Sequence, residues 1–345
     1  MSTNCKPLRF SSSCSFIGAL INRIEIFLFI FSISLVEAQQ IKVESVPNQP
    51  YLKYLLSTEN DTITFYLSAS SETKELPLIV YIQGSGMNSL FAKVNGRIVP
   101  TSGHMTWYDV ARNKYRILII EKPGVSYLQT GESDSFDKSF SLESWSDRIV
   151  RSIDFVTQNI RITKNKILVV GHSEGGLVAS RVSKLMNGTI SNVAIMGGEG
   201  PPQLYSMYKF AENGIFFNTE EYNLQTSQQR LKYLTDNLNL ILAEPHSTQK
   251  KFWGFTYLRW SSMLRTSVID ELEKYDGKIF VIQGAKDTAV FPESAVIAYA
   301  TLLSKGRNVI FKYIENADHS FNLIDNSDID GWKQVIEEII AWFDL

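Results

Sequence analysis

Residues 167–176 read Ile-Leu-Val-Val-Gly-His-Ser-Glu-Gly-Gly, and this stretch decides the fold class. Its four branched apolar residues, Ile167–Val170, predict a fully buried strand. The next five residues, Gly171–Gly175, have the form G-x-S-x-G. Apolar residues then recur at helical spacing from Leu177 to Met186, and Asn187-Gly188 ends the pattern. A strand, a sharp turn and a helix in this order are the context in which the motif marks an exposed, nucleophilic serine.

Ser173 is therefore the candidate nucleophile. A turn this sharp needs neighbours with almost no side chain, which explains Gly171 and Gly175. The backbone amide of Glu174 would then face any oxygen bound beside the serine. The alternative is a glycine-rich turn that carries an incidental serine, so the remainder of the chain has to supply the partners of Ser173.

Composition narrows the class of protein. The 345 residues are 44% hydrophobic and carry a formal net charge of -2, which is typical of a globular protein. This length fits one large α/β domain or two smaller ones. Because the charge is close to balanced, nothing indicates a nucleic acid or an anionic membrane as a partner.

The N-terminus resembles a secretory signal peptide. Lys6, Arg9 and Arg23 precede a very apolar run at residues 26–36, and small or aliphatic residues lead up to Ala38. The run is shorter than the roughly 20 residues that span a membrane comfortably. We expect cleavage after Ala38 and a chain that is secreted or lies in the periplasm or cell envelope, without stable membrane insertion. The alternative is an uncleaved N-terminal anchor.

Both cysteines, Cys5 and Cys14, lie in this leader. Residues 39–345 contain none. We therefore expect no disulfide, no thiolate metal site and no cysteine nucleophile in the mature chain.

Buried strands and helices alternate along most of the chain. Alternation of this kind predicts a parallel sheet with helices on both faces, here built from residues 39–200 and 276–345. The predicted strands, which are rich in branched or aromatic residues, are 62–67, 78–82, 115–120, 167–170, 193–196, 278–283 and 309–313.

The alternation stops between residues 201 and 275, where no buried strand is predicted. Leu231, Leu234, Leu238 and Ile241 recur at helical spacing, and aromatic residues are dense shortly afterwards. We interpret residues 201–275 as an inserted, mostly helical cap, and expect most of its aromatic residues to form the core of that insertion.

A serine nucleophile needs a base and an acid that orients the base. His319 follows the last predicted strand and Asp287 follows the one before, at the edge of the sheet where Ser173 would lie. We expect these three residues to form the catalytic site, with Glu199 as the alternative acid. The simpler alternatives are a surface-loop role for His319 and a turn or helix-capping role for Asp287. His172 is expected to point away along the turn.

Acyl transfer also requires donors for the oxygen that becomes negatively charged. The amide of Glu174 is the first candidate. The second is the amide of Ser85, because Gly84 and Gly86 on either side allow a close approach of the backbone. A plain glycine turn is the alternative.

Three segments together resemble the α/β-hydrolase superfamily: Gly-His-Ser-Glu-Gly-Gly, then Gly-Ala-Lys-Asp, then Ala-Asp-His-Ser-Phe. The resemblance implies an eight-stranded, mostly parallel sheet, a Ser173–Asp287–His319 triad and a cap inserted after the strand 193–196. The chain departs from the family pattern at Gln83, where many members have histidine, and it has no His-Gly-Gly-Gly run. This departure weakens an assignment to the lipases and esterases that use such a run, and it leaves the second oxyanion donor open.

The resemblance implies a serine hydrolase for an ester, thioester or amide of a small substrate, with no metal or organic cofactor. Carboxylesterase-like activity is our first expectation. A peptidase similar to the proline iminopeptidases is the alternative, and it would need a cap carboxylate such as Glu212, Glu220 or Glu221 to hold a substrate amine. A third possibility is a non-catalytic binding protein on a hydrolase fold, which burial of Ser173 without a pocket would favour.

Overall fold

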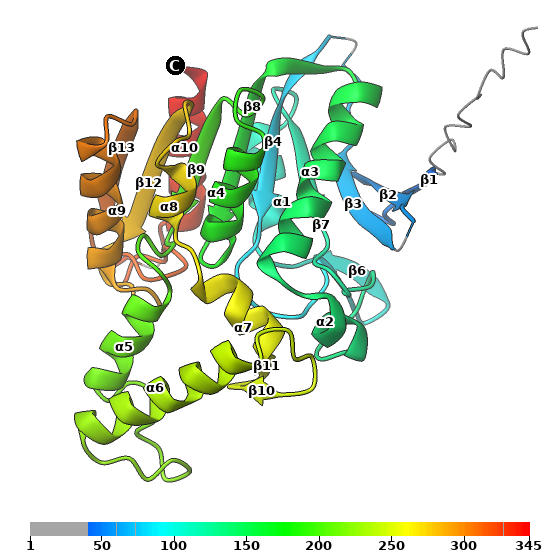
Figure 1. The fold of residues 1–345 in the computed structure, drawn as a ribbon. Coiled ribbons are helices and arrows are strands. Elements are labelled where there is room, and N and C mark those ends of the chain that lie inside the picture. Colours follow the sequence, from blue (N-terminus) through cyan, green and yellow to red (C-terminus); the bar gives the residue numbers. More distant parts are fainter. Residues whose placement is uncertain (1–40, 60, 73, 327) are drawn as a thin grey trace, which may run out of the picture. The chain divides into compact units, whose positions relative to one another are not determined.

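A computed structural model describes residues 41–59, 61–72, 74–326 and 328–345, which belong to one compact unit (Figure 1). The predicted signal peptide, residues 1–38, lies outside the described residues. Among the described helices, none is long and apolar enough to cross a membrane.

The strands are β1 (Ile41–Ser45), β2 (Tyr51–Ser57), β3 (Thr62–Ser68), β4 (Leu76–Ile82), β5 (Phe91–Val94), β6 (Arg97–Pro100), β7 (Arg116–Ile120), β8 (Ile162–His172), β9 (Asn192–Met196), β10 (Lys251–Phe252), β11 (Phe255–Thr256), β12 (Lys278–Gly284) and β13 (Val309–Ile314). The helices are α1 (His104–Ala111), α2 (Asp134–Ser139), α3 (Leu142–Asn159), α4 (Gly175–Leu185), α5 (Leu204–Glu212), α6 (Ser227–Ala243), α7 (Tyr257–Leu264), α8 (Val268–Leu272), α9 (Pro292–Ser304) and α10 (Gly331–Asp344).

The main sheet is mostly parallel, as predicted. Within the described residues it has nine strands in the order β1-β2-β3-β7-β4-β8-β9-β12-β13. Six neighbouring strands run parallel: β7, β4, β8, β9, β12 and β13. At one end of the sheet, β1, β2 and β3 form an antiparallel edge. The expected number was eight. The β1–β2 hairpin was not predicted because β1 is an edge strand with largely exposed side chains, so its sequence lacks an apolar run.

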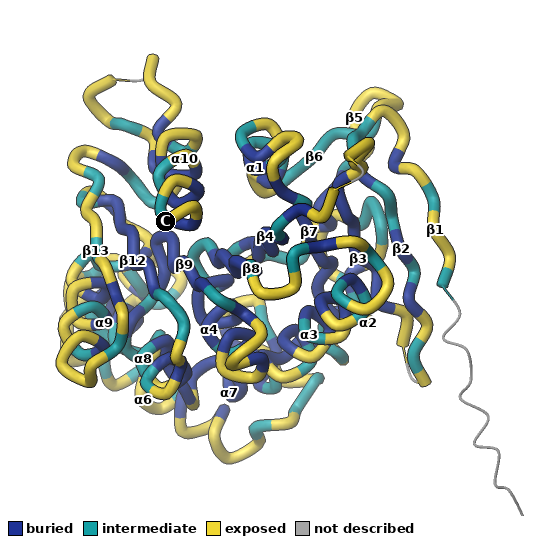
Figure 2. Tube along the Cα trace, turned by 90° about the horizontal axis from the view of Figure 1, so that it is seen from above, coloured by how far each residue is buried: buried dark blue, intermediate teal, exposed yellow. Residues whose placement is uncertain are grey.

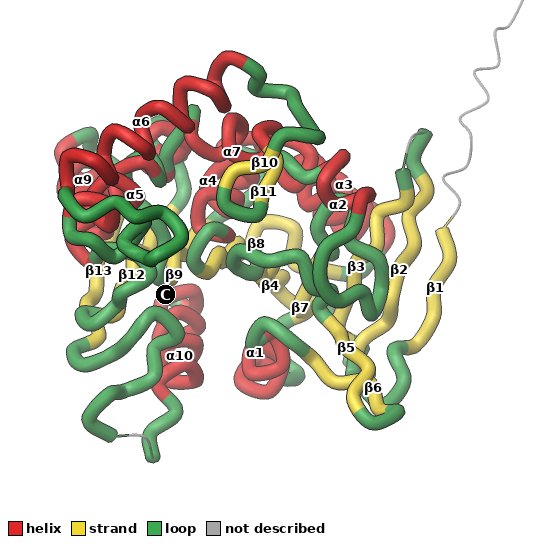
Figure 3. Tube along the Cα trace, turned by 90° about the horizontal axis from the view of Figure 1, so that it is seen from below, coloured by secondary structure: helices red, strands yellow, loops and turns green. Residues whose placement is uncertain are grey.

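Helices cover both faces of the sheet (Figure 3). Alternate residues of β4 show the division, because Val80 and Ile82 face one layer of core while Ile79 and Tyr81 face the other. Helices α3, α4, α8 and α9 contribute to the first layer, and α1 and α10 to the second. Figure 2 shows the central strands buried between them.

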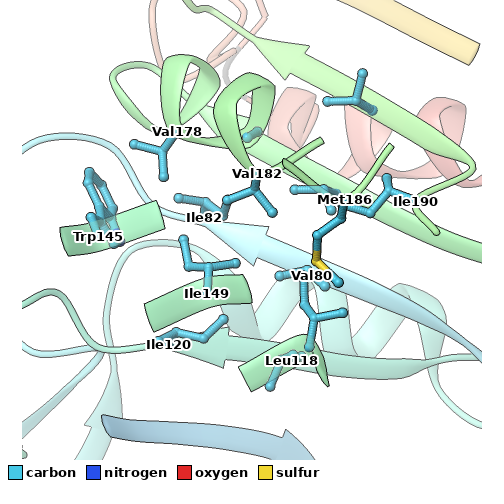
Figure 4. Packing of buried hydrophobic residues seen from close by; sticks show 14 of the residues in the cluster. Val80, Ile82, Leu118, Ile120, Trp145, Ile149, Val178, Val182, Met186 and Ile190 are labelled. Carbon is cyan, nitrogen blue, oxygen red and sulfur yellow. The ribbon is translucent and has the colours of Figure 1, made fainter. Parts of the chain in front are cut away.

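Figure 4 shows the first layer around β4 and β7. Leu118 and Ile120 of β7 lie beside the β4 residues, and Val178 and Val182 of α4 cover them. All four side chains are almost completely buried, which fixes α4 on the sheet. Since α4 follows the G-x-S-x-G turn directly, this packing also fixes the turn.

Residues 201–275, which we call the cap region, contain α5, α6, α7, α8 and the short hairpin β10–β11 (Figure 1). As the spacing predicted, Leu234, Leu238 and Ile241 of α6 are buried, and they belong to a hydrophobic cluster separate from the sheet core. The C-terminal end of the cap region does not belong to this separate cluster. There, Val268 and Leu272 of α8 pack in the core layer beside the sheet. The cap region is therefore anchored on the sheet at its C-terminal end.

Candidate active site

The G-x-S-x-G motif forms a two-residue turn between β8 and α4. Ser173 has φ = 55°, in the left-handed region that non-glycine residues rarely occupy. Its amide donates a hydrogen bond of 2.8 Å to the carbonyl oxygen of Met196 on β9. A Cβ atom at Gly171 would lie 2.0 Å from the carbonyl oxygen of Gly175, and one at Gly175 would lie 2.5 Å from that of Gln83. Glycine is therefore required on both sides of the serine, and the turn holds Ser173 in a strained conformation.

His319 and Asp287 come together at the ends of β13 and β12. Nδ1 of His319 lies 2.8 Å from Oδ2 of Asp287, whose side chain is fully buried. The same oxygen accepts a hydrogen bond of 2.8 Å from Nε2 of Gln283, and Oδ1 accepts bonds of 2.8 and 2.9 Å from the amides of Ala289 and Val290. A carboxylate held by this set of donors can accept the Nδ1 proton and fix the orientation of the imidazole ring. Sequence analysis had not singled out Gln283.

His172 does not point away from the site, so this expectation was wrong. Its ring centroid lies 4.9 Å from that of His319, and its Nε2 lies 3.0 Å from the backbone oxygen of His319. Trp332 packs edge-on against the ring, with centroids 5.0 Å apart. Burial lowers the pKa of His172 to about 4, so the ring is neutral at physiological pH and can donate one N–H to that carbonyl. His172 therefore supports the loop that carries His319.

One cavity of about 280 Å³ is lined by five of the six predicted site residues, Asp287 being the exception. Ser173, His319, Glu174, Ser85 and Glu199 all line it. The other lining residues include apolar ones, Leu177, Pro201, Val268, Ala289 and Val290, and polar ones, Gln203, Thr266 and Ser267. Among the described residues, no group of three His, Cys, Asp or Glu side chains is arranged to hold a metal ion.

Glu199, the alternative acid, lies in the cavity wall but has other partners. Its Oε2 accepts a hydrogen bond of 2.8 Å from Oγ of Ser206 on α5. Burial raises the pKa of Glu199 to about 8, and the negative charge of Asp287 acts in the same direction. Since Nδ1 of His319 is already bonded to Asp287, the geometry favours Asp287 as the acid that orients the ring.

The side chain of Glu174 joins the turn at Ser173 to the cap region. It forms a buried ion pair with Arg259 of α7, and both side chains are almost completely inaccessible. The guanidinium group of Arg259 also lies over the rings of Trp260 and Phe255, 3.9 and 4.6 Å from their centroids. The turn that carries Ser173 is thus connected to α7 by a charged contact.

The loop that carries Ser85 is held by a lysine that sequence analysis missed. Nζ of Lys122, just after β7, donates hydrogen bonds of 2.5 and 2.8 Å to the carbonyl oxygens of Gly84 and Gly86. Lys122 is only 1% exposed. Burial lowers its pKa to about 8, so the ammonium form is still the main one at neutral pH.

We compared the chain with known families, curated proteins and solved structures. No family model and no curated protein matches the sequence. The esterase Est1E from Butyrivibrio proteoclasticus superposes with a TM-score of 0.55 at 14% identity, over 86% of this chain and 99% of Est1E. An esterase from Rhizomucor miehei gives 0.55 at 13% identity, over 89% of this chain and 84% of that one. The acylaminoacyl peptidase from Pyrococcus horikoshii gives 0.56 at 11% identity, over 89% of this chain and 42% of the peptidase.

The chain has the α/β-hydrolase fold. The expected fold class is thereby confirmed, with the strand order of the described sheet as further support. At these identities the likeness concerns the α/β-hydrolase fold alone. The esterase and peptidase activities in the names belong to the solved proteins.

Proposed function

We propose that this protein is a serine hydrolase that cleaves an ester, thioester or amide of a small substrate through an acyl-enzyme. One observation carries the proposal: His319, which is hydrogen-bonded to the buried Asp287, lines the same cavity as Ser173, and Ser173 occupies the strained turn between β8 and α4. A nucleophile, a base and an acid that orients the base are the groups that acyl transfer needs.

Each residue has a defined role in the proposed reaction. Oγ of Ser173 attacks the substrate carbonyl, and Nε2 of His319 takes its proton and then passes it to the leaving group. Asp287 keeps Nδ1 protonated and stabilises the imidazolium. The amides of Glu174 and Ser85 bind the oxyanion. Water, activated by His319, then releases the acyl group and restores the serine.

The cavity supports a small substrate. A volume of about 280 Å³ is at the lower limit of typical small-molecule sites, and several of its lining residues are aliphatic. Carboxylesterase-like activity on short acyl chains is therefore our first choice. The binding-protein alternative would be favoured by a buried Ser173 without a pocket, whereas Ser173 lines this cavity.

Glu199 favours an aminopeptidase-like activity as a second candidate. Glu199 lines the cavity, and it takes part in none of the ion pairs formed by the described residues. Burial raises its pKa to about 8, and a substrate ammonium group would stabilise the ionised form of its carboxyl group. The cap carboxylates considered from sequence do not fit this role, because Glu212, Glu220 and Glu221 are exposed and lie outside the cavity lining.

A substrate panel separates the two activities. The wild type, Ser173→Ala and the control Ser320→Ala would be assayed with p-nitrophenyl esters of increasing chain length and with aminoacyl p-nitroanilides. Hydrolysis that is lost in Ser173→Ala and kept in Ser320→Ala supports the proposal, because Ser320 is an exposed neighbour of His319. Hydrolysis that survives in folded Ser173→Ala rejects it.

Glu199→Gln then assigns the substrate class. For an aminopeptidase, kcat/KM for the anilides falls by about tenfold or more while ester hydrolysis is kept, since one buried charged contact is lost. For an esterase, kcat/KM for the anilides and for the esters should both change little.

We also propose that the mature chain begins near Gln39 and is exported. The support is the sequence pattern of residues 1–38. Mass spectrometry of the N-terminal peptide from the native host tests this, and an intact chain starting at Met1 in the cytoplasmic fraction would contradict it.

A further inference from the structure

The loop between β4 and β5, residues 83–90, is held by two neighbouring ionisable side chains after β7. Lys122 donates to the carbonyl oxygens of Gly84 and Gly86, as described above. The carboxylate of Glu121, one residue earlier, accepts hydrogen bonds from Oγ of Ser89 and from the amide of Leu90. Both are buried. Two consecutive residues, Glu121 and Lys122, therefore form hydrogen bonds with the two ends of the same loop.

Lys122 determines the orientation of the peptide unit between Gly84 and Ser85. This unit is planar and trans, because no cis peptide occurs in the described chain, so its C=O and N–H point in opposite directions. Since the carbonyl of Gly84 points to Lys122, the N–H of Ser85 points away from it. Ser85 lines the cavity, and a Cβ atom at Gly84 would lie 3.0 Å from Cβ of Ser173. The loop therefore passes directly against the nucleophile.

Stability alone does not explain a lysine here. Removing an ammonium group from water is unfavourable by several kcal/mol, and an apolar residue of similar size would avoid that penalty. The ring of Trp145, 4.7 Å from Nζ, would accommodate such a residue as well. The lysine adds a positive charge near Glu174 and Glu121, and it adds a charged donor aimed at two carbonyl oxygens, which is the feature that bears on the loop.

We infer that Lys122 is the positioning residue of the second oxyanion donor: its ammonium group fixes and polarises the peptide unit whose N–H, on Ser85, faces the reacting carbonyl oxygen. The inference rests on the proposed hydrolase activity. Polarisation follows from hydrogen-bond cooperativity, because a cation bound to the carbonyl end of a peptide unit strengthens donation at its N–H end.

The first test is Lys122→Met in the full chain, assayed with p-nitrophenyl acetate beside the wild type. Loss of a single oxyanion donor lowers kcat by about 100- to 1000-fold. We expect a loss in or just below this range with KM nearly unchanged, because the contact forms mainly in the transition state. A trifluoromethyl ketone, whose adduct with serine carries an oxyanion, should lose affinity by a similar factor. A lysine that only stabilises the fold would change the melting temperature and leave kcat of the folded protein unaltered.

Chemical rescue supplies a matched pair. Lys122→Cys is made in a Cys5→Ser, Cys14→Ser background, so that position 122 carries the single thiol of the chain. The unfolded protein is alkylated with 2-bromoethylamine, which restores an ammonium group at the length of lysine, or with iodoethane, which does not, and is then refolded. The aminoethyl form should recover most of kcat and the ethyl form should not.

A variant of Ser85 tests the donor if Met or ethyl-cysteine at position 122 prevents folding. Ser85→Pro removes the N–H that Lys122 orients, and the control Ser320→Ala changes an exposed serine outside the cavity lining. We expect a large loss of kcat in folded Ser85→Pro and near-wild-type activity in Ser320→Ala.

The inference is overturned if folded Lys122→Met or folded Ser85→Pro keeps kcat within about twofold of the wild type, since one donor is worth far more than that. Failure of the proposed function is recognised separately. In that case the wild type itself neither hydrolyses the ester nor reacts at Ser173 with a fluorophosphonate.

Discussion

Asp287→Asn is the change that tests the catalytic geometry most sharply, because the two side chains have almost the same shape. In the structure Oδ1 of Asp287 accepts from two backbone amides, and Oδ2 accepts from Gln283 and His319. The backbone amides cannot become acceptors. The side-chain oxygen of the introduced asparagine must therefore face them, and its NH₂ group must take the place of Oδ2.

Gln283 and His319 respond differently to that NH₂ group. Oε1 of Gln283 is buried without a hydrogen-bond partner among the described residues, so the amide can turn over and accept from the new donor. The imidazole of His319 can accept at Nδ1 only by moving its proton to Nε2. Nε2 would then be unable to take the proton of Ser173, and the site would lack a base.

The expected effect is therefore large on activity and small on stability. An asparagine in this role lowers kcat by about 10⁴-fold, which corresponds to about 5 kcal/mol of transition-state stabilisation. The free energy of unfolding should change by only about 1 kcal/mol, the usual value of one neutral hydrogen bond.

The assay is ester hydrolysis near neutral pH, with urea unfolding in parallel. Asp318→Asn is the control, because Asp318 is adjacent to His319 in the chain but bonds to Ser320 and Asn322 instead, and it should keep activity. A folded Asp287→Asn within about tenfold of the wild type would refute the assignment, given the loss expected for an acid in this role. A loss of the expected size in Glu199→Gln instead would make Glu199 the acid.

Three further predictions concern other parts of the structure. Glu174→Gln leaves Arg259 buried without its carboxylate, so urea unfolding should show a loss of about 3–5 kcal/mol. Arg259→Met should be less destabilising, because the positive charge of Lys122 still acts on Glu174. Gly175→Ala places a Cβ atom 2.5 Å from two backbone oxygens at the end of β4, and thermal unfolding should show a loss of about 3 kcal/mol. Burial lowers the pKa of His104 to about 4, below the value in the unfolded chain, so unfolding takes up a proton in mild acid and the wild type is destabilised as the pH falls. Between about pH 7 and pH 5 the free energy of unfolding of the wild type should fall by about 2 kcal/mol relative to that of His104→Gln. If the difference between the two proteins is the same at both pH values, the prediction is contradicted.

Several features of the fold and the site could be predicted from sequence because each has a local signal. Buried parallel strands are continuous apolar runs, so the strands around Val80 and Val169 were found. The sharp turn at Ser173 was found because its geometry requires glycine at fixed positions. That Asp287 and His319 meet at the edge of the sheet where Ser173 lies was predicted from the rule that the carboxyl ends of parallel strands share one edge.

The features that were missed depend on contacts between distant segments. Lys122 is adjacent to a predicted strand, but its acceptors lie in a loop near residue 85, and burial of a lysine is unusual enough that sequence favours exposure. Gln283 is the last residue of a predicted strand, and only the folded turn brings the carboxylate of Asp287 back to it. His172 was placed wrongly because the direction of its ring depends on the loop after β13 and on Trp332.

The most direct test of the central claim is the reaction of Ser173 with a fluorophosphonate probe. The wild type and Ser173→Ala would be treated at neutral pH, and the labelled peptide identified by mass spectrometry. An activated serine predicts rapid labelling of the peptide that contains Ser173 and none in the variant. A folded wild type that remains unlabelled, or that is labelled at another serine, would contradict the account.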